Sequence, residues 1–211
     1  IPGLVVIMPA DPKSILESYR YAVQEHKGPV VMLEHRLLYE LSYEEDATEL
    51  SHPLFGSKLE REGTDLTIIA TSVMVLEAKR AADHLAEIGV SVEIINLHSI
   101  SHPDKEMILK SVEKTGKMLI ADTSWAAYGV AAEMNRIVNE YNPSILKAPT
   151  HSMGMVNTPC PTAKVLEDMY YPDVHDIVDV CAGMVIGKNH AMTLPKKESM
   201  TDFYKHFKGP F

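Results

Sequence analysis

Short apolar runs alternate with stretches of helical periodicity along most of the chain. Runs rich in aliphatic and β-branched residues predict buried strands, and they fall at 4–8, 30–33, 66–70, 92–95 and 118–121. Apolar residues spaced three and four apart predict helices between these strands, at 12–26, 75–88, 104–112 and 130–138. Alternating strands and helices are typical of a parallel sheet covered on both faces. The predicted fold class is therefore α/β.

The chain divides into four segments. Asp11 is a natural N-cap with Pro12 at the first helical position, so residues 1–39 predict a β-α-β unit. Two strands and one helix cannot cover both sides of a parallel pair, so we expect this unit to be the end of a larger domain. Polar residues then predict a linker with at most short strands, before a main domain and a C-terminal extension. The predicted bounds are 40–65 for the linker, 66–182 for the main domain and 183–211 for the extension.

Two elements near the end of the main domain are less clear from the pattern. Residues 146–148 could add another strand. Residues 176–180 form a short apolar element whose type periodicity alone does not decide.

Composition and charge narrow the function classes. The chain has 20 Lys and Arg residues and 29 Asp and Glu residues. The resulting net charge of −9 disfavours binding to nucleic acid. No apolar run approaches the roughly 20 residues of a membrane span, so we expect no membrane insertion. Cys160 and Cys181 are too few to staple a fold of 211 residues, which favours a reducing, intracellular compartment. The start at Ile1, without methionine or leader, predicts a chain cut from something longer.

Polar residues follow several of the predicted strands, where open α/β sheets place ligands. They are Glu34, Thr71 and Ser72, residues 96–98 and residues 122–124. None of these groups forms a complete catalytic set, and the glycine-rich dinucleotide, Walker and nucleophile-elbow motifs do not occur.

The histidines and the single tryptophan are further chemical candidates. His98 and His102, four apart, would share a helical face as metal ligands, but Pro103 follows and a helix is expected from Asp104, which favours a surface turn. Trp125 could anchor a partner, although burial at a helix start is the favoured interpretation. Three more histidines are interpreted as surface or interface residues rather than acids or bases, namely His26, His35 and His151.

A family resemblance rests on several short sequence segments that follow one another along the chain. They are Ile1-Pro2-Gly3-Leu4-Val5-Val6, Pro29-Val30-Val31-Met32-Leu33-Glu34-His35, Arg61-Glu62-Gly63-Thr64-Asp65-Leu66-Thr67-Ile68, Val92-Glu93-Ile94-Ile95-Asn96-Leu97, Lys114-Thr115-Gly116, Leu166-Glu167 and Tyr171-Pro172-Asp173. Over about residues 1–181 the chain resembles the beta subunit of thiamine-diphosphate-dependent 2-oxoacid dehydrogenases of the pyruvate and branched-chain type, within the transketolase-like superfamily.

The resemblance implies a domain assignment. Residues 1–39 would be the tail of a pyrimidine-binding domain, and residues 66–182 a three-layer, mostly parallel domain of the transketolase C-terminal type. The catalytic glutamate and histidine of the family lie upstream of the Ile1-Pro2-Gly3 string, so it implies no catalytic, cofactor-binding or metal residue here. Thiamine diphosphate with Mg would belong to the complete enzyme, and this chain alone is expected to be inactive.

The resemblance also implies partners. These are an alpha subunit and a second beta subunit in a heterotetramer, and the lipoyl acyltransferase core of a multienzyme complex, in the cytoplasm or, in a eukaryote, the mitochondrial matrix. The expected contact regions are 122–128, the helix after Gly129 and 159–173. The single residues assigned to partner binding are Asp122, Trp125, Tyr128, Glu167, Asp173 and Phe207, the last in a tail that could form a short amphipathic docking helix.

Several positions depart from the family pattern. His26 and Gly28 replace an aspartate and an asparagine that help to hold a monovalent cation, and neither side chain supplies a hard oxygen. His98 replaces an arginine, and Asn157 replaces an aspartate. Two alternatives therefore stay open: a non-catalytic assembly or regulatory module, and the half-chain of a transketolase or deoxyxylulose-phosphate synthase.

Overall fold

A computed structural model describes residues 1–41, 55–190 and 192–197. Its first unit is a two-stranded parallel sheet, formed by β1 (Val5–Ile7) and β2 (Val30–Met32). Helix α1 (Pro12–Gln24) connects the two strands, and the short 3-10 helix η1 (Arg36–Glu40) follows. The predicted β-α-β arrangement is confirmed.

The start of α1 follows from local chemistry. Asp11 and Ser14 form a capping box, in which the Ser14 N–H donates to Asp11 Oδ1 at 2.7 Å and the Asp11 N–H donates to Ser14 Oγ at 3.1 Å. The expectation that 30–33 is a buried strand is wrong in detail. Val31 is 39% exposed, because α1 covers one face of this two-stranded sheet and Val31 points to the other.

The main unit is built on a five-stranded sheet in the order β3-β5-β4-β6-β7. Its strands are β3 (Lys58–Arg61), β4 (Leu66–Ala70), β5 (Val92–Asn96), β6 (Met118–Trp125) and β7 (His151–Met155). β3 is antiparallel to β5, and the other pairs are parallel. Residues 146–148 are not a strand. The edge strand begins instead at His151, because η2 (Pro143–Ile145) and a turn first bring the chain back to the start of β6.

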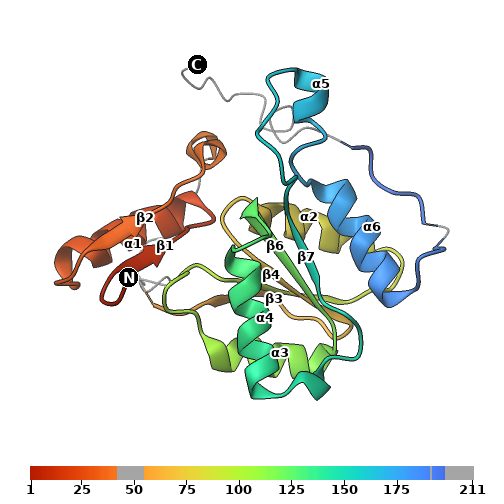
Figure 1. Ribbon diagram of the computed structural model, residues 1–211, viewed down its shortest axis with the longest axis horizontal. Coiled ribbons are helices and arrows are strands. Elements are labelled where there is room, and N and C mark those ends of the chain that lie inside the picture. The colour runs from red at the N-terminus through yellow and green to blue at the C-terminus, as the bar shows by residue number, and fades with distance from the viewer. Residues whose placement is uncertain (42–54, 191, 198–211) are drawn as a thin grey trace.

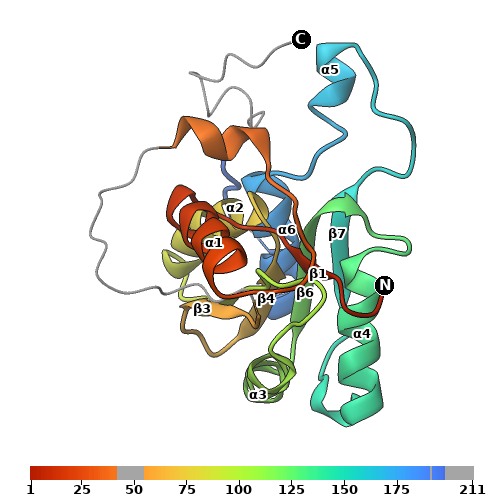
Figure 2. The same ribbon diagram turned by 90° about the vertical axis from the view of Figure 1, so that its left-hand side faces the viewer.

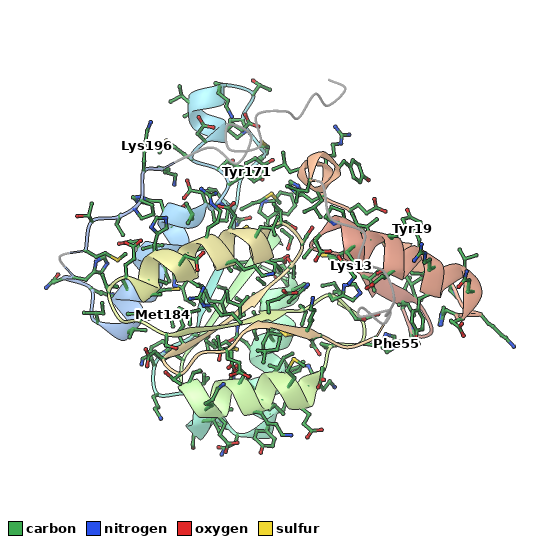
Figure 3. All side chains as sticks on the ribbon, turned by 180° about the vertical axis from the view of Figure 1, so that it is seen from behind. Lys13, Tyr19, Phe55, Tyr171, Met184 and Lys196 are labelled. Atoms are coloured by element: carbon green, nitrogen blue, oxygen red, sulfur yellow. The ribbon has the colours of Figure 1, made fainter. Side chains whose placement is uncertain are left out.

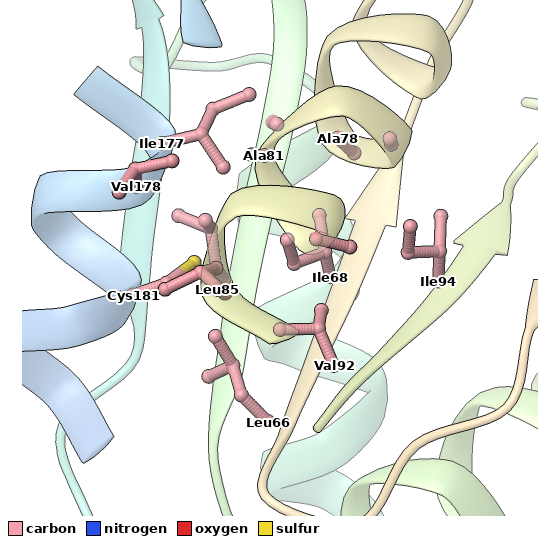
Figure 4. Close-up of a cluster of buried hydrophobic side chains, with 14 of the residues drawn as sticks. Leu66, Ile68, Ala78, Ala81, Leu85, Val92, Ile94, Ile177, Val178 and Cys181 are labelled. Atoms are coloured by element: carbon pink, nitrogen blue, oxygen red, sulfur yellow. The ribbon is translucent and has the colours of Figure 1, made fainter. Parts of the chain in front are cut away.

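Helices cover both faces of this sheet, so the predicted three-layer α/β fold is confirmed (Figure 1). On one face lie α2 (Met74–Ala86) and α6 (Val174–Val185), and on the other α3 (Lys105–Thr115) and α4 (Val130–Tyr141). The element at 176–180 is thus part of a helix. Figure 4 shows Ile177 and Cys181 of α6 facing Leu85 of α2 above the strands, all within one buried apolar cluster. Burial of this kind supplies most of the stability of the layers.

The β-α-β unit is attached to the carboxyl edge of the main sheet, beside α2 (Figure 2). The Met8 N–H donates to the His98 carbonyl at 2.8 Å, and the Ile100 N–H donates to the Val6 carbonyl at 2.9 Å. Leu38 and Val73 share a small apolar core across the junction. Backbone pairing and apolar contact therefore join the two units.

The chain after α6 folds back along that helix. Lys197 Nζ lies 2.9 Å from Asp176 Oδ2, and His190 Nε2 lies 3.2 Å from Asp179 Oδ1. Met192, among others, packs against the apolar cluster under α6. None of the helices in the described ranges is long and apolar enough to cross a membrane.

Candidate functional site

Residues 122–129 form the end of β6 and the turn before α4, and we call this segment the 122–129 loop. It carries three of the six partner-binding candidates and is held by one buried carboxylate. Asp122 is 2% exposed. Its Oδ1 accepts hydrogen bonds from Thr71 Oγ1 at 2.5 Å and from the Thr123 N–H at 2.8 Å, and its Oδ2 accepts one from Ser124 Oγ at 2.5 Å. Asp122 therefore fixes the start of the loop to the end of β4 and is not presented to a partner.

Two aromatic side chains project from this loop. Trp125 is 46% exposed, and its indole N–H donates to the Val156 carbonyl at 3.1 Å. The expectation that Trp125 is buried at a helix start is wrong, because β6 continues to Trp125 and α4 begins only at Val130. Tyr128 is fully exposed and has a φ of 61°, a left-handed conformation that is uncommon outside glycine. The loop thus presents two aromatic rings to solvent.

Glycine shapes the end of the loop. A Cβ on Gly129 would lie 2.5 Å from the Trp125 carbonyl oxygen and 3.0 Å from Ser124 Oγ. Only glycine allows this close approach of α4 to the loop. The fixed Asp122 and the tight turn at Gly129 together limit the directions in which Trp125 and Tyr128 can point.

The segment 156–173 lies beside this loop. The Val156 N–H donates to the Tyr170 carbonyl at 3.2 Å, so the residue that holds Trp125 is itself tied to the chain after α5 (Lys164–Glu167). Glu167 lies 3.6 Å from Lys164 in a surface ion pair. Exposed apolar side chains surround it on the same short helix and the following turn, namely Val165, Leu166 and Met169.

Tyr171 lies in the segment that connects α5 to α6 (Figure 3). Its hydroxyl lies 3.6 Å from Cys160 Sγ, and burial together with this thiol raises the pKa of Tyr171 to about 12. Tyr171 is therefore protonated at neutral pH. Cys160 is exposed and Cys181 is buried, and both are free thiols.

Asp173, another candidate, is a structural residue of α6. Its Oδ1 accepts from the Asp176 N–H at 3.2 Å in a capping box, and it is buried near Glu77 of α2. Burial raises the pKa of Asp173 and the pKa of Glu77. Arg80 lies 3.0 Å from Glu77 and partly offsets that effect. The sequence pattern did not predict that Asp173 and Glu77 would be buried together at the junction between α2 and α6.

The histidines occupy varied places. His98 is buried with a φ of 49°, and its Nε2 lies 3.4 Å from Ser18 Oγ, so the interpretation of a surface turn is wrong for His98. His26 packs edge-on against Phe55, with ring centroids 5.8 Å apart, and a Cβ on Gly28 would approach its Nε2 to 2.7 Å. Burial lowers the pKa of His35, which caps η1.

The six candidate residues do not form one cluster. Asp122 and Trp125 lie at the end of β6 and Tyr128 lies in the turn before α4, whereas Glu167 lies on α5 and Asp173 caps the start of α6. Phe207 lies outside the described residues. Sequence reasoning missed Val156, because its contribution is a backbone carbonyl that no pattern marks.

Comparisons with known proteins place this fold. A family model described as "Transketolase, C-terminal domain" matches residues 56–177. The chain is 38% identical over 182 residues to the mitochondrial pyruvate dehydrogenase E1 component subunit beta-1 of Arabidopsis thaliana, covering 84% of this chain and 50% of that protein. It is 37% identical over 184 residues to the mitochondrial beta subunit of the same component in Saccharomyces cerevisiae, covering 84% and 50%.

A solved structure titled "Split gene transketolase, inactive beta4 tetramer" superposes with a TM-score of 0.65 at 21% identity, covering 90% of this chain and 59% of that one. That likeness concerns the fold alone. The chain spans about half the length of the curated relatives it matches, and it resembles the C-terminal portion of such beta subunits. It belongs to the transketolase C-terminal domain family.

Proposed function

We propose that the chain is the C-terminal portion of the beta subunit of a 2-oxoacid dehydrogenase first component. The complete enzyme would decarboxylate a 2-oxoacid on thiamine diphosphate and pass the acyl group to lipoamide. The observation that carries the proposal is the identity of 36–38% to pyruvate dehydrogenase beta subunits along most of the chain.

This portion would serve assembly rather than chemistry. Thiamine diphosphate is held through a divalent cation, which needs several oxygen ligands. In the described ranges no group of three or more His, Cys, Asp or Glu side chains is arranged to hold a metal. We assign thiamine diphosphate to the complete enzyme and derive no catalytic step from the described residues.

The loop 122–129 would be a contact between subunits. Aromatic side chains held by a fixed backbone lose little conformational entropy on binding, and they are enriched where protein interfaces concentrate their energy. Trp125 and Tyr128 meet this description, and the apolar residues around Glu167 are exposed as well. We propose the alpha subunit or a second beta subunit as the occupant in a heterotetramer. The acyltransferase core, the cytoplasmic or mitochondrial location and the assignment of residues 1–39 to a pyrimidine-binding domain belong to the same proposal.

Reconstitution tests this function. The complete beta subunit, co-expressed with an alpha subunit, should yield a stable heterotetramer with thiamine-dependent 2-oxoacid decarboxylation, while this portion alone should show none. Trp125→Ala with Tyr128→Ala should weaken assembly, measured by analytical ultracentrifugation, with Tyr141→Ala on the exposed end of α4 as the control. Assembly without decarboxylation would favour the non-catalytic module. Ketol transfer between sugar phosphates would favour the transketolase half-chain.

A further inference from the structure

The last helix of the main unit is covered by chain from two sides. On one side α6 packs against α2 through its fully buried apolar residues. On another side the chain turns back after the helix and runs along it (Figure 1). We call residues 186–190 and 192–197 the strap. The strap adds two apolar side chains, Met192 and Leu194, to the cluster that α6 and α2 share.

The strap docks as an extended peptide. Met192 and Leu194 are half-buried while Thr193 between them is exposed, which is the alternation of an extended chain. The Pro195 carbonyl accepts a hydrogen bond from His175 Nδ1 at 2.8 Å, and Lys197 Nζ lies 2.9 Å from Asp176 Oδ2. The start of α6 therefore receives a segment with two apolar residues two apart, then a proline and a lysine.

Charge favours this pairing of strap and helix. The strap carries three lysines and no carboxylate, in a chain whose net charge is −9. The helix presents Asp176 to Lys197, and Asp179 lies 3.2 Å from His190 Nε2. Complementary charge of this kind selects one partner segment over others. A basic segment thus recognises an acidic stripe of α6.

Backbone hydrogen bonds hold the strap only weakly. Residues 192–197 form neither helix nor strand. Within the described part of the chain, their backbone makes a single hydrogen bond, the one from His175 to the Pro195 carbonyl. Segments with few backbone hydrogen bonds and half-buried contacts open at low free energy. We therefore expect the strap to leave α6 without unfolding the main unit.

A short turn decides which helix the strap reaches. Gly187 has a φ of 121°, and the His190 N–H donates to the Gly187 carbonyl at 3.2 Å to close the turn. Glycine adopts many backbone conformations at little cost, so a change at Gly187 redirects the strap. The strap of a second copy would make every contact of the resident one, and two copies that exchange straps form a closed symmetric pair.

We propose that two copies of this chain exchange their straps, so that residues 192–197 of each copy dock on α6 of the other. The surface involved is the stripe of α6 that carries His175, Asp176 and Asp179. This inference goes beyond the proposed function and does not depend on it.

Cross-linking of two isotopic forms tests the exchange. The full-length protein, mixed in equal amounts of a light and a heavy form, is incubated at high concentration and treated with a carbodiimide, which joins Lys197 to Asp176 without a spacer. We expect mass spectrometry to find this cross-link between light and heavy chains. Deleting Lys188 and Asn189 shortens the turn, so the mixed cross-link should rise to about half of the total, the random limit for complete exchange.

Matched controls separate exchange from other contacts between copies. Lys79 Nζ lies 2.6 Å from Glu60 Oε2 inside the main unit, so their cross-link should always join residues of one isotopic form. Met192→Ser/Leu194→Ser should remove the mixed strap cross-link, whereas Val23→Ser/Ile88→Ser, at exposed apolar positions elsewhere, should leave it unchanged. In the shortened variant, a strap cross-link found only within single isotopic forms, or no strap cross-link at all, would overturn the proposal.

Discussion

Replacing Asp122 with alanine should destabilise the protein strongly and release the loop after β6. The carboxylate accepts three hydrogen bonds in a buried setting, from Thr71, Thr123 and Ser124. Hydrogen bonds to a charged group contribute about 1.5–3 kcal/mol each, but they are not additive, and Ser124 can turn toward solvent. The Thr71 hydroxyl is fully buried and would lose its acceptor. We therefore expect a loss of about 3–5 kcal/mol in the free energy of unfolding.

Urea unfolding followed by circular dichroism measures this loss. Trp125 is the only tryptophan of the chain, so its emission reports the loop separately, and a shift to longer wavelength is expected before global unfolding. Asp122→Asn should cost about 1–2 kcal/mol, because the amide keeps the shape and one acceptor oxygen.

Asp83→Ala is the matched control. Asp83 also pairs, with Arg61 at 2.6 Å, but its side chain is 75% exposed, so the expected loss is below about 1 kcal/mol. If Asp122→Ala destabilised the protein no more than Asp83→Ala, or left the Trp125 emission unchanged, the role assigned to Asp122 would be refuted.

Three further changes test other parts of the fold. Burial raises the pKa of Glu77, so the contribution of this group to stability is present at low pH and is lost as the pH rises through the raised pKa. The Glu77→Gln variant should therefore gain stability relative to wild type between about pH 4 and pH 7. A difference in urea midpoints that stayed constant over this range would contradict this expectation. A thiol reagent should modify Cys160 in the folded protein and Cys181 only on unfolding, because Cys181 is fully buried and burial raises its pKa; mass spectrometry distinguishes the two. Gly63→Ala should cost about 2 kcal/mol or more, since a Cβ there would overlap the backbone of β5, whereas Gly183→Ala, with open space around it, should not destabilise; equal melting temperatures for the two variants would argue against this packing.

The central layers were predictable because their residues are almost uniformly buried. β4 and β5 are buried along their whole length, so their aliphatic runs predicted both strands within a residue. β7 was not predicted, since it is an edge strand with only Met153 buried and with polar His151 and Ser152. An edge strand needs few apolar residues, and its position depends on the neighbour it pairs with.

The candidate site was predicted in part. Thr71 and Asp122 both follow predicted strands, and in the structure the Thr71 hydroxyl donates to Asp122 Oδ1 at 2.5 Å. The exposure of Trp125 was not predictable, because it depends on how far β6 extends and on the carbonyl of a residue 31 positions later. Contacts between backbone and distant side chains leave no periodic signal in the chain.

The placement of β1 has a consequence for folding cooperativity. β1 hydrogen-bonds on one side to β2, as in Leu33 N–H to the Ile7 carbonyl at 2.9 Å, and on the other to residues 98–101. The amides of Met8 and Ile100 both donate across the junction, so the two units cannot separate here without breaking both of these backbone hydrogen bonds. The amides of Met8 and Ile100 should therefore exchange with solvent deuterium through the same opening event, as one cooperative unit rather than as two separately melting parts.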